Sequence, residues 1–155
     1  MQARAPSPVS ALDAHLGFWL RFVSNHVSAR FAAQVEAEGA SVTEWVALRT
    51  LFGKPQTTHA ELIEALGMTK GAVSKVVSRL EEKGLARREL AEGSAREQVL
   101  VLTAQGRTLV PRLAALADQN EEHFFGHMSP RDRQALMKPF QALAAHHHLK
   151  VLPVA

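Results

Sequence analysis

Basic and hydroxyl-bearing residues are concentrated in one short stretch of the chain, TKGAVSKVVSRL, at positions 69–80. Lys70, Lys75 and Arg79 lie there with no Asp or Glu among them, whereas a solvent-facing helix more often alternates acidic and basic residues four positions apart. Basic side chains neutralise phosphates, and basic and hydroxyl groups hydrogen-bond to the edges of bases. The composition of this stretch therefore favours contact with a nucleic acid over an ordinary solvated helix.

The same stretch follows a helical period. Its apolar residues from Val73 to Leu80 recur at steps of three and four, which indicates a helix with one buried face. A capping-box spacing over residues 58–61 predicts a shorter helix before it, and Gly67 separates the two. Two short helices joined by a glycine turn are typical of a helix-turn-helix, in which the second helix presents its N-terminal residues to the DNA major groove.

After Gly84 the period changes to that of short strands. The runs LARREL and QVLVLT flank AEGSARE, which contains a glycine turn, and they predict a β-hairpin. A hairpin behind a recognition helix is a wing, and Arg96 near its tip would suit the narrow minor groove; the alternative is a hairpin that only closes the core. The residues expected to contact DNA are Thr57 and Thr58, through phosphate, and Thr69, Lys70, Gly71, Ala72, Ser74, Lys75, Ser78, Arg79 and Arg96.

The two ends of the chain have apolar stripes that a domain of this size cannot easily bury. A stripe from Leu12 to Val35 predicts one long helix, and Thr103 and Ser129 are placed to cap two C-terminal helices. We expect these helices to form a homodimer, although the first could instead lie across its own domain. The residues assigned to the dimer contact are Leu12, Leu16, Leu116, Phe124, Leu136, Phe140 and Leu143.

The expected fold is mainly α with a small β-hairpin wing, that is, a winged helix-turn-helix core with dimerisation helices at both ends. The expected boundaries are a tail at 1–9, a dimerisation helix at 10–38, the winged helix-turn-helix core at 41–103, C-terminal dimerisation helices at 104–149 and a tail at 150–155.

Composition excludes several classes of site. The chain has 155 residues and no cysteine, which rules out disulfides, thiolate metal sites and cysteine nucleophiles. The net charge is only +3, so an anionic partner must be met by a local basic patch. There is no long apolar run and no N-terminal signal stretch, so we expect a cytoplasmic protein without a membrane partner. No catalytic or phosphate-loop motif occurs, so neither an enzyme activity nor a cofactor is expected.

Two tryptophans, a histidine and an arginine suggest a ligand pocket between the first two helices. His15, Trp19, Arg21 and Trp45 combine aromatic and cationic side chains, which suits a small aromatic carboxylate. The alternative is that both tryptophans belong to the core and that the polar pair is solvated.

The order of these elements, together with the runs TTHAELIEALGMTKGAVSKVVSRLEEKGLARRE and VLVLTAQGRTL, resembles the MarR family of bacterial transcription regulators over nearly the whole chain. The resemblance implies a winged-helix homodimer that binds a pseudo-palindromic operator, often as a repressor released by a small aromatic or anionic ligand. The wing of the family usually carries Asp two residues before its minor-groove Arg, and here these positions are Ser94 and Arg96. Family members that sense peroxides through cysteine are excluded, because this chain has none.

Two other functions stay open at this level. His123 and His127 are four residues apart, a spacing that allows two imidazoles on one helix to bind one metal. This would make a metal-responsive regulator, but no third ligand is evident and we assign no metal site. The other alternative is a winged helix that binds only protein, for which Lys75 and Arg79 would be dispensable.

Overall fold

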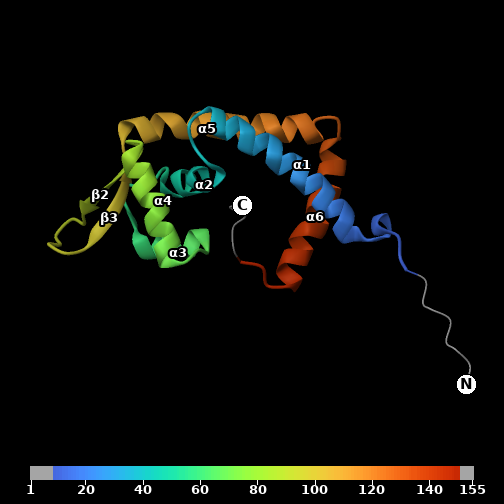
Figure 1. Cartoon of the computed structure of the whole chain (residues 1–155), viewed down its shortest axis with the longest axis horizontal. Coiled ribbons are helices and arrows are strands. Elements are labelled where there is room, and N and C mark those ends of the chain that lie inside the picture. The colour runs from blue at the N-terminus through green and yellow to red at the C-terminus, as the bar shows by residue number, and fades with distance from the viewer. Residues whose placement is uncertain (1–8, 151–155) are drawn as a thin grey trace, which may run out of the picture.

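The computed structural model describes residues 9–150, and its helices fall into two groups (Figure 1). One group consists of α1 (Leu16–Ala37), α5 (Ala104–Phe125) and α6 (Pro130–His146). The other consists of α2 (Val42–Leu51), α3 (His59–Leu66) and α4 (Lys70–Glu82), together with a small sheet. Helix α1 packs along α5, and α5 runs from the sheet at one end to α6 at the other. The predicted fold, a winged helix-turn-helix with additional helices at both ends, is confirmed.

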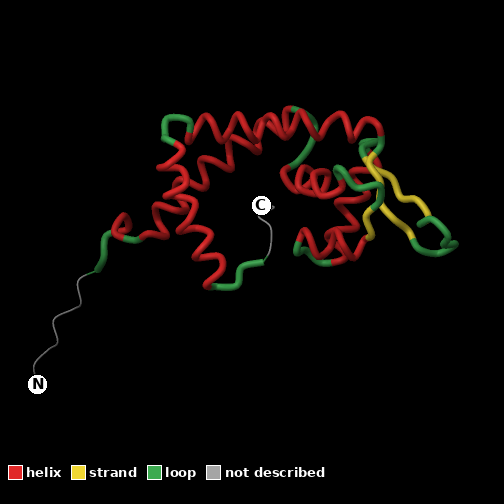
Figure 2. The backbone as a smooth tube through the Cα atoms, turned by 180° about the vertical axis from the view of Figure 1, so that it is seen from behind, coloured by secondary structure: helices red, strands yellow, loops and turns green. Residues whose placement is uncertain are grey.

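The sheet has three antiparallel strands in the order β1-β3-β2. These are β1 (Thr57–Thr58), β2 (Ala86–Leu90) and β3 (Gln98–Leu102). Strands β2 and β3 form the predicted hairpin, which extends away from the helices (Figure 2). Strand β1 is absent from the sequence-based prediction; it places Thr57 opposite Leu100 of β3. This pairing joins the segment before α3 to the base of the wing.

The helix starts in the winged-helix part are closed by their own side chains, as the capping spacings predict. Ser41 Oγ accepts from the Glu44 N–H and Thr58 Oγ1 from the Glu61 N–H, each at 3.1 Å, and both glutamates return the bond. Thr69 Oγ1 caps α4 by accepting from the backbone N–H of its third residue. These bonds satisfy N–H groups that a helix leaves unpaired at its start. The start of each helix is therefore determined by bonds between residues three positions apart in the sequence.

The hydrophobic core lies between α2, α3, α4, the sheet and the first half of α5. Most of its larger members have exposed fractions of 2% or less, so the core excludes water almost completely. These members include Leu48, Leu51, Leu62, Leu66, Val73, Val76, Val77, Leu80, Leu100, Val110 and Leu113.

The helix expected over residues 10–38 is divided near its start. Leu12–Ala14 form a separate 3-10 turn and His15 has an extended backbone, so that α1 begins at Leu16. Leu12 therefore does not continue the stripe of α1, as the spacing alone had indicated. Within the described part of the chain, no helix has both the length and the hydropathy that crossing a membrane requires.

Candidate nucleic-acid interface

Helix α4 has one buried face and one exposed, basic face. Val73 and Leu80 are completely buried, whereas Lys70, Lys75 and Arg79 are exposed. The helix is thus held by its apolar side and presents cations to solvent along its N-terminal part. Among the smaller residues predicted to contact DNA, Thr69 and Gly71 are exposed, and Ala72, Ser74 and Ser78 are partly exposed.

The cations of this surface differ in their pairing from five basic residues elsewhere in the chain. Five cations elsewhere form ion pairs with carboxylates, namely Lys83, Arg87, Arg88, Arg112 and Arg133. Within residues 9–150, the three cations of α4 and Arg96 of the wing form no such pair. Unpaired cations leave a local positive potential, which attracts phosphate and releases counterions when it binds.

His59, the first residue of α3, lies close to this surface, and its surroundings favour the neutral ring. Burial lowers the pKa of His59 below its ordinary value of 6.5, and the neighbouring Arg88 and Lys70 lower it further, while Glu81 opposes them. Burial and nearby positive charge both disfavour the protonated ring. The positive potential of the interface is therefore due to its lysines and arginines.

The predicted phosphate contact of the Thr57 hydroxyl is wrong. Thr57 is completely buried in β1, and its Oγ1 has no hydrogen-bond partner among the described residues. The neighbouring Thr58 is half-buried and uses its hydroxyl oxygen to cap α3. Pairing of β1 with β3 turns the side chain of Thr57 into the core, which the sequence between two helices does not indicate.

The wing tip is closed by Ser94, at the position where the family usually carries Asp. Ser94 Oγ accepts from the backbone N–H of Arg96 at 3.2 Å and from that of Glu97 at 2.9 Å. The backbone N–H of Ala91 donates to the Glu97 oxygen at 2.7 Å across the same turn. The hydroxyl thus makes side-chain bonds that organise the turn, and the exposed Arg96 stands on an ordered tip.

The four residues of the predicted ligand pocket do not come together. Trp19 Nε1 donates to the backbone oxygen of Asp13 at 2.8 Å, near the start of α1. Trp45 instead packs on Phe31, with ring centroids 6.5 Å apart. Trp19 and Phe31 are twelve residues apart on one helix, or about 18 Å at 1.5 Å per residue, so the two tryptophans cannot share a small ligand. His15 and Arg21 are exposed and line none of the cavities described below.

Trp19 does line a different cavity. An apolar groove of about 580 Å³ lies between α1 and α6, and its walls include Trp19, Leu20, Phe125, Pro139 and Leu143. Its volume is in the range of small-molecule sites, roughly 300–1,000 Å³. The sequence contained a signal for this groove in the apolar stripes of α1 and α6, but not their relative placement.

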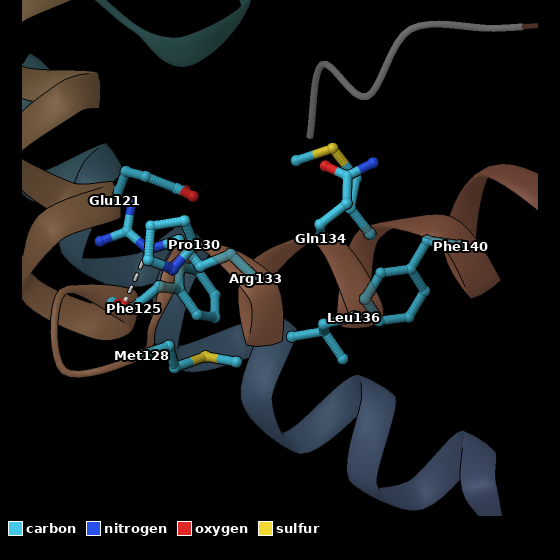
Figure 3. A pocket seen from close by; sticks show the side chains of 9 residues that line it. Glu121, Phe125, Met128, Pro130, Arg133, Gln134, Leu136 and Phe140 are labelled. Carbon is cyan, nitrogen blue, oxygen red and sulfur yellow. Dashed lines mark hydrogen bonds between the residues drawn. The ribbon is translucent and has the colours of Figure 1, made fainter.

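A second hollow, of about 420 Å³, lies at the turn from α5 into α6 (Figure 3). Phe125, Leu136 and Phe140 surround it, and Arg133 turns back so that its Nε donates to the Phe125 oxygen at 3.1 Å. Arg133 also forms an ion pair with Glu122 at 3.1 Å. These polar bonds link α6 to the end of α5, and no residue of α6 is buried.

Most residues predicted to form a dimer contact are exposed in the single chain. Leu12 and Leu16 are 76% and 91% exposed, and no residue of α6 is buried. Leu136, Phe140 and Leu143 form the exposed apolar side of α6. The other two predicted residues, Leu116 and Phe124, are half-buried, and Leu116 packs against the core of its own chain.

The helical histidine pair of the metal alternative is not formed. Helix α5 ends at Phe125, so His123 is helical while His127 lies in the following turn. Among the described residues there is no group of three or more His, Cys, Asp or Glu side chains that could hold a metal.

Sequence reasoning missed two sets of buried polar contacts. Glu44, only 3% exposed, pairs with Lys83 at 2.7 Å between their side chains. Asn120, 5% exposed, donates from Nδ2 to the backbone oxygen of Val27 at 3.1 Å and accepts from Arg30 at 3.0 Å. The partners are far apart in the chain, and no local pattern indicates them.

Comparison with known proteins places this arrangement in a family. A model of the MarR family matches residues 38–97. An HTH-type transcriptional repressor of Mycobacterium tuberculosis is 33% identical over 104 residues, which are 67% of this chain and 75% of that protein. The transcriptional regulator HosA of Escherichia coli is 28% identical over 105 residues, or 68% of this chain and 78% of that protein.

Solved structures share the fold over most of the chain. CouR of Rhodococcus jostii bound to p-coumaroyl-CoA superposes with a TM-score of 0.74 at 21% identity, covering 88% of this chain and 96% of that one. BpsR of Bordetella bronchiseptica, whose DNA binding is regulated by 6-hydroxynicotinic acid, also gives 0.74 at 20% identity, covering 88% and 98%. With its basic α4, its ordered wing and these relatives, the chain belongs to the MarR family and is a DNA-binding transcriptional regulator.

Proposed function

We propose that the protein is a homodimeric repressor that binds a pseudo-palindromic operator and is released from it by a small aromatic or anionic effector in the cytoplasm. The observation that carries the proposal is the set of unpaired cations on α4 and the wing. In this reading α4 enters the major groove and Arg96 the minor groove. Lys75 and Arg79 neutralise phosphates or reach base edges, and Ser74 and Ala72 lie beside the bases.

The homodimer is supported by the apolar surface of α1 and α6. Trp19, Leu20, Phe22 and Val23 of α1 are 45–51% exposed. A helix with apolar residues on several sides is stable in water only if another element covers it. A second copy of the chain, related by a two-fold axis, would cover the α1–α6 surface and place two α4 helices about 34–36 Å apart, one DNA turn.

An effector site in the groove between α1 and α6 is supported by the position of that groove. Its walls belong mainly to α1 and α6, the helices assigned to the dimer contact, so a ligand there would change their packing. A small change at such a boundary is amplified into a change of spacing between the recognition helices. An aromatic acid fits the apolar walls, and Trp19 provides a stacking surface. Of the solved structures similar in fold, CouR is bound to p-coumaroyl-CoA, and the DNA binding of BpsR is regulated by 6-hydroxynicotinic acid.

The DNA-binding function is tested by selecting fragments of sheared genomic DNA with the purified protein and sequencing them. The wild type should enrich an inverted repeat with half-sites about one turn apart. The double variant Lys75→Ala/Arg79→Ala should enrich nothing, and Lys138→Ala, which removes a cation from α6, should behave as the wild type. On the selected operator, the double variant removes up to four phosphate contacts per dimer, so the slope of log K against log salt should fall by about 3–4.

The effector is tested by fluorescence. In a Trp45→Phe variant only Trp19 remains, so titration with a series of hydroxybenzoic and hydroxycinnamic acids reports on the groove alone. A ligand that changes this fluorescence should also lower operator affinity at the same concentration. Flat titrations across the series, with operator binding intact, would contradict the effector site while leaving the DNA-binding function in place.

A further inference from the structure

The C-terminal end of the recognition helix is bound to the connection between α1 and α2. Lys83, the residue that follows α4, donates from Nζ to Glu44 Oε2 at 2.7 Å and to the backbone oxygen of Gly39 at 2.8 Å. Gly39 follows the end of α1, and Glu44 lies in the first turn of α2. The Lys83 ammonium group therefore links the end of α4 to the connection between α1 and α2.

The carboxylate that receives this bond is buried and fixed. The Glu44 side chain is 4% exposed, and its Oε2 also accepts from the backbone N–H of Ser41 at 3.3 Å, within the capping box of α2. A buried carboxylate that loses its cation is strongly destabilised. A cation at the C-terminal end of a helix is also favoured by the helix dipole. The bond between Lys83 and Glu44 is therefore more restrictive than an ion pair between two mobile surface chains.

The same end of α4 is also held by the start of α5. Thr103, the capping residue of α5, donates from Oγ1 to the Gly84 oxygen at 2.6 Å and from its backbone N–H to the Leu85 oxygen at 3.1 Å. Gly106 sits so close that an added Cβ would lie 2.0 Å from the Leu85 oxygen. The C-terminal end of α4 is thus fixed by bonds to the segments leading to α1 and to α5, whereas its N-terminal half is held by the apolar contacts of Val73 and Val76 and carries the exposed basic residues.

We propose that Lys83 is a positioning residue for operator binding, which fixes the angle of α4 relative to α1 and thereby the spacing of the two recognition helices. This inference rests on the homodimer of the proposed function. Helix α4 has 13 residues, about 20 Å at 1.5 Å per residue. A tilt of about 10° at Lys83 would therefore shift the DNA-reading end by about 3 Å, close to the 3.4 Å rise of one base pair.

The test is operator spacing rather than operator affinity. Affinity is measured for the selected operator and for versions whose half-sites are moved apart or together by one base pair. The affinity of the wild type should fall by about tenfold or more with either change in spacing, a cost in the range of a mismatched base pair. Lys83→Met should bind the best operator more weakly than the wild type does. Its affinities for the three operator spacings should differ by less than about threefold, because a helix that is not held at one angle is not preorganised for one spacing. Lower stability alone reduces the active fraction and leaves these ratios unchanged.

The matched control is Arg112→Met. It removes the ion pair between Arg112 of α5 and Glu38 at the end of α1, in the same region, without touching an atom of α4. Its spacing preference should equal that of the wild type. Lys83→Met leaves the Glu44 charge buried without its partner and could prevent folding. In that case the double variant Lys83→Met/Glu44→Gln, which removes this charge, replaces Lys83→Met in every measurement.

A distance measurement gives a second readout without DNA. Since the chain has no cysteine, Glu82→Cys places one spin label per protomer at the end of α4. The distance distribution between the two labels should be broader with Lys83→Met than without it. Unchanged spacing preference and an unchanged distribution would overturn the positioning function. A wild type with no dipolar coupling at all would contradict the homodimer itself, and this inference with it.

Discussion

In the winged-helix part of the molecule, Leu62 and Leu80 are completely buried, whereas Leu136, Phe140 and Leu143 of α6 expose 40–49% of their surface. Both regions have regular amphipathic helices with capped starts. They differ in what covers the apolar side. α4 packs on α2, α3 and the sheet of its own chain, while α6 has no buried residue. The comparison shows that the apolar side of the DNA-reading part is covered within one chain, whereas that of α6 is not, and the proposed homodimer would cover it with a second chain.

The largest effect should come from breaking the proposed dimer contact. Phe140 is 44% exposed in the single chain, so Phe140→Glu loses about half of the roughly 1.5–3 kcal/mol of a fully buried aromatic side chain. It also places a carboxylate in the contact, at a cost of about 1 kcal/mol or more, and a two-fold interface contains both costs twice. The dimer should weaken by about 3–6 kcal/mol, or roughly 10²–10⁴ in Kd. Sedimentation equilibrium measures this directly. The adjacent exposed Gln141→Glu is the control for added charge, and a Phe140→Glu protein that stays dimeric would show that α6 faces solvent.

A substitution in the self-contained region should act differently. Leu80→Ala removes a completely buried side chain of α4, which should lower the free energy of unfolding by about 2–5 kcal/mol. Urea unfolding at two protein concentrations separates the regions. The loss caused by Leu80→Ala should be the same at both concentrations, whereas that caused by Phe140→Glu should depend on concentration. Equal concentration dependence for both variants would remove the distinction between the two regions.

A smaller effect is expected at the wing, which belongs to the DNA-reading part but contributes little to its core. Ser94→Ala removes the acceptor for the Arg96 and Glu97 N–H groups, at a cost of about 1 kcal/mol. Operator affinity should fall by no more than about tenfold, with unchanged dimerisation. Ser94→Asp should retain or strengthen the turn, because a carboxylate is a stronger acceptor. Hydrogen exchange of the two amides checks the cause, and exchange that is equally slow in Ser94→Ala would contradict it.

The smallest effect concerns pH and is confined to the winged-helix part. Burial and Arg88 hold the pKa of His59 below 6.5, so the folded state takes up a proton less readily than the unfolded chain. The stability that neutral His59 contributes is complete above the unfolded-state pKa and is lost as pH falls through the folded-state pKa. Urea unfolding between about pH 7.5 and about pH 5 should show a shallower acid loss for His59→Gln than for the wild type. Parallel curves would contradict the depressed pKa.

The sequence was sufficient to predict features that depend on interactions between residues close together in the chain. Ser41 with Glu44 and Thr58 with Glu61 form capping boxes because the bonded atoms lie within one helical turn of each other. The buried face of α4 could be predicted for the same reason, from the helical spacing of its apolar residues. Strand β1 was not, since two residues have no period and its partner Leu100 is distant in the chain. Thr57 was misassigned as a consequence.

The ligand pocket shows the limit of reasoning from residue types. Aromatic and cationic side chains near two helix starts suggest a site only if the helices bring them together, and a rigid α1 carries Trp19 far from Trp45. The groove that Trp19 does line depends on where α6 folds back, which is set by the turn after α5 and by the bonds of Arg133. Neither is visible in the pattern of a single helix.

The sequence by itself determined the helices, their caps, the wing and the basic face of α4, because each depends on interactions between residues a few positions apart. Only the tertiary structure decided that Thr57 is buried, that α6 leaves its apolar side open, and that Lys83 joins α4 to Glu44 and Gly39. These features depend on contacts between distant segments, whose geometry is set by the packing of the whole chain.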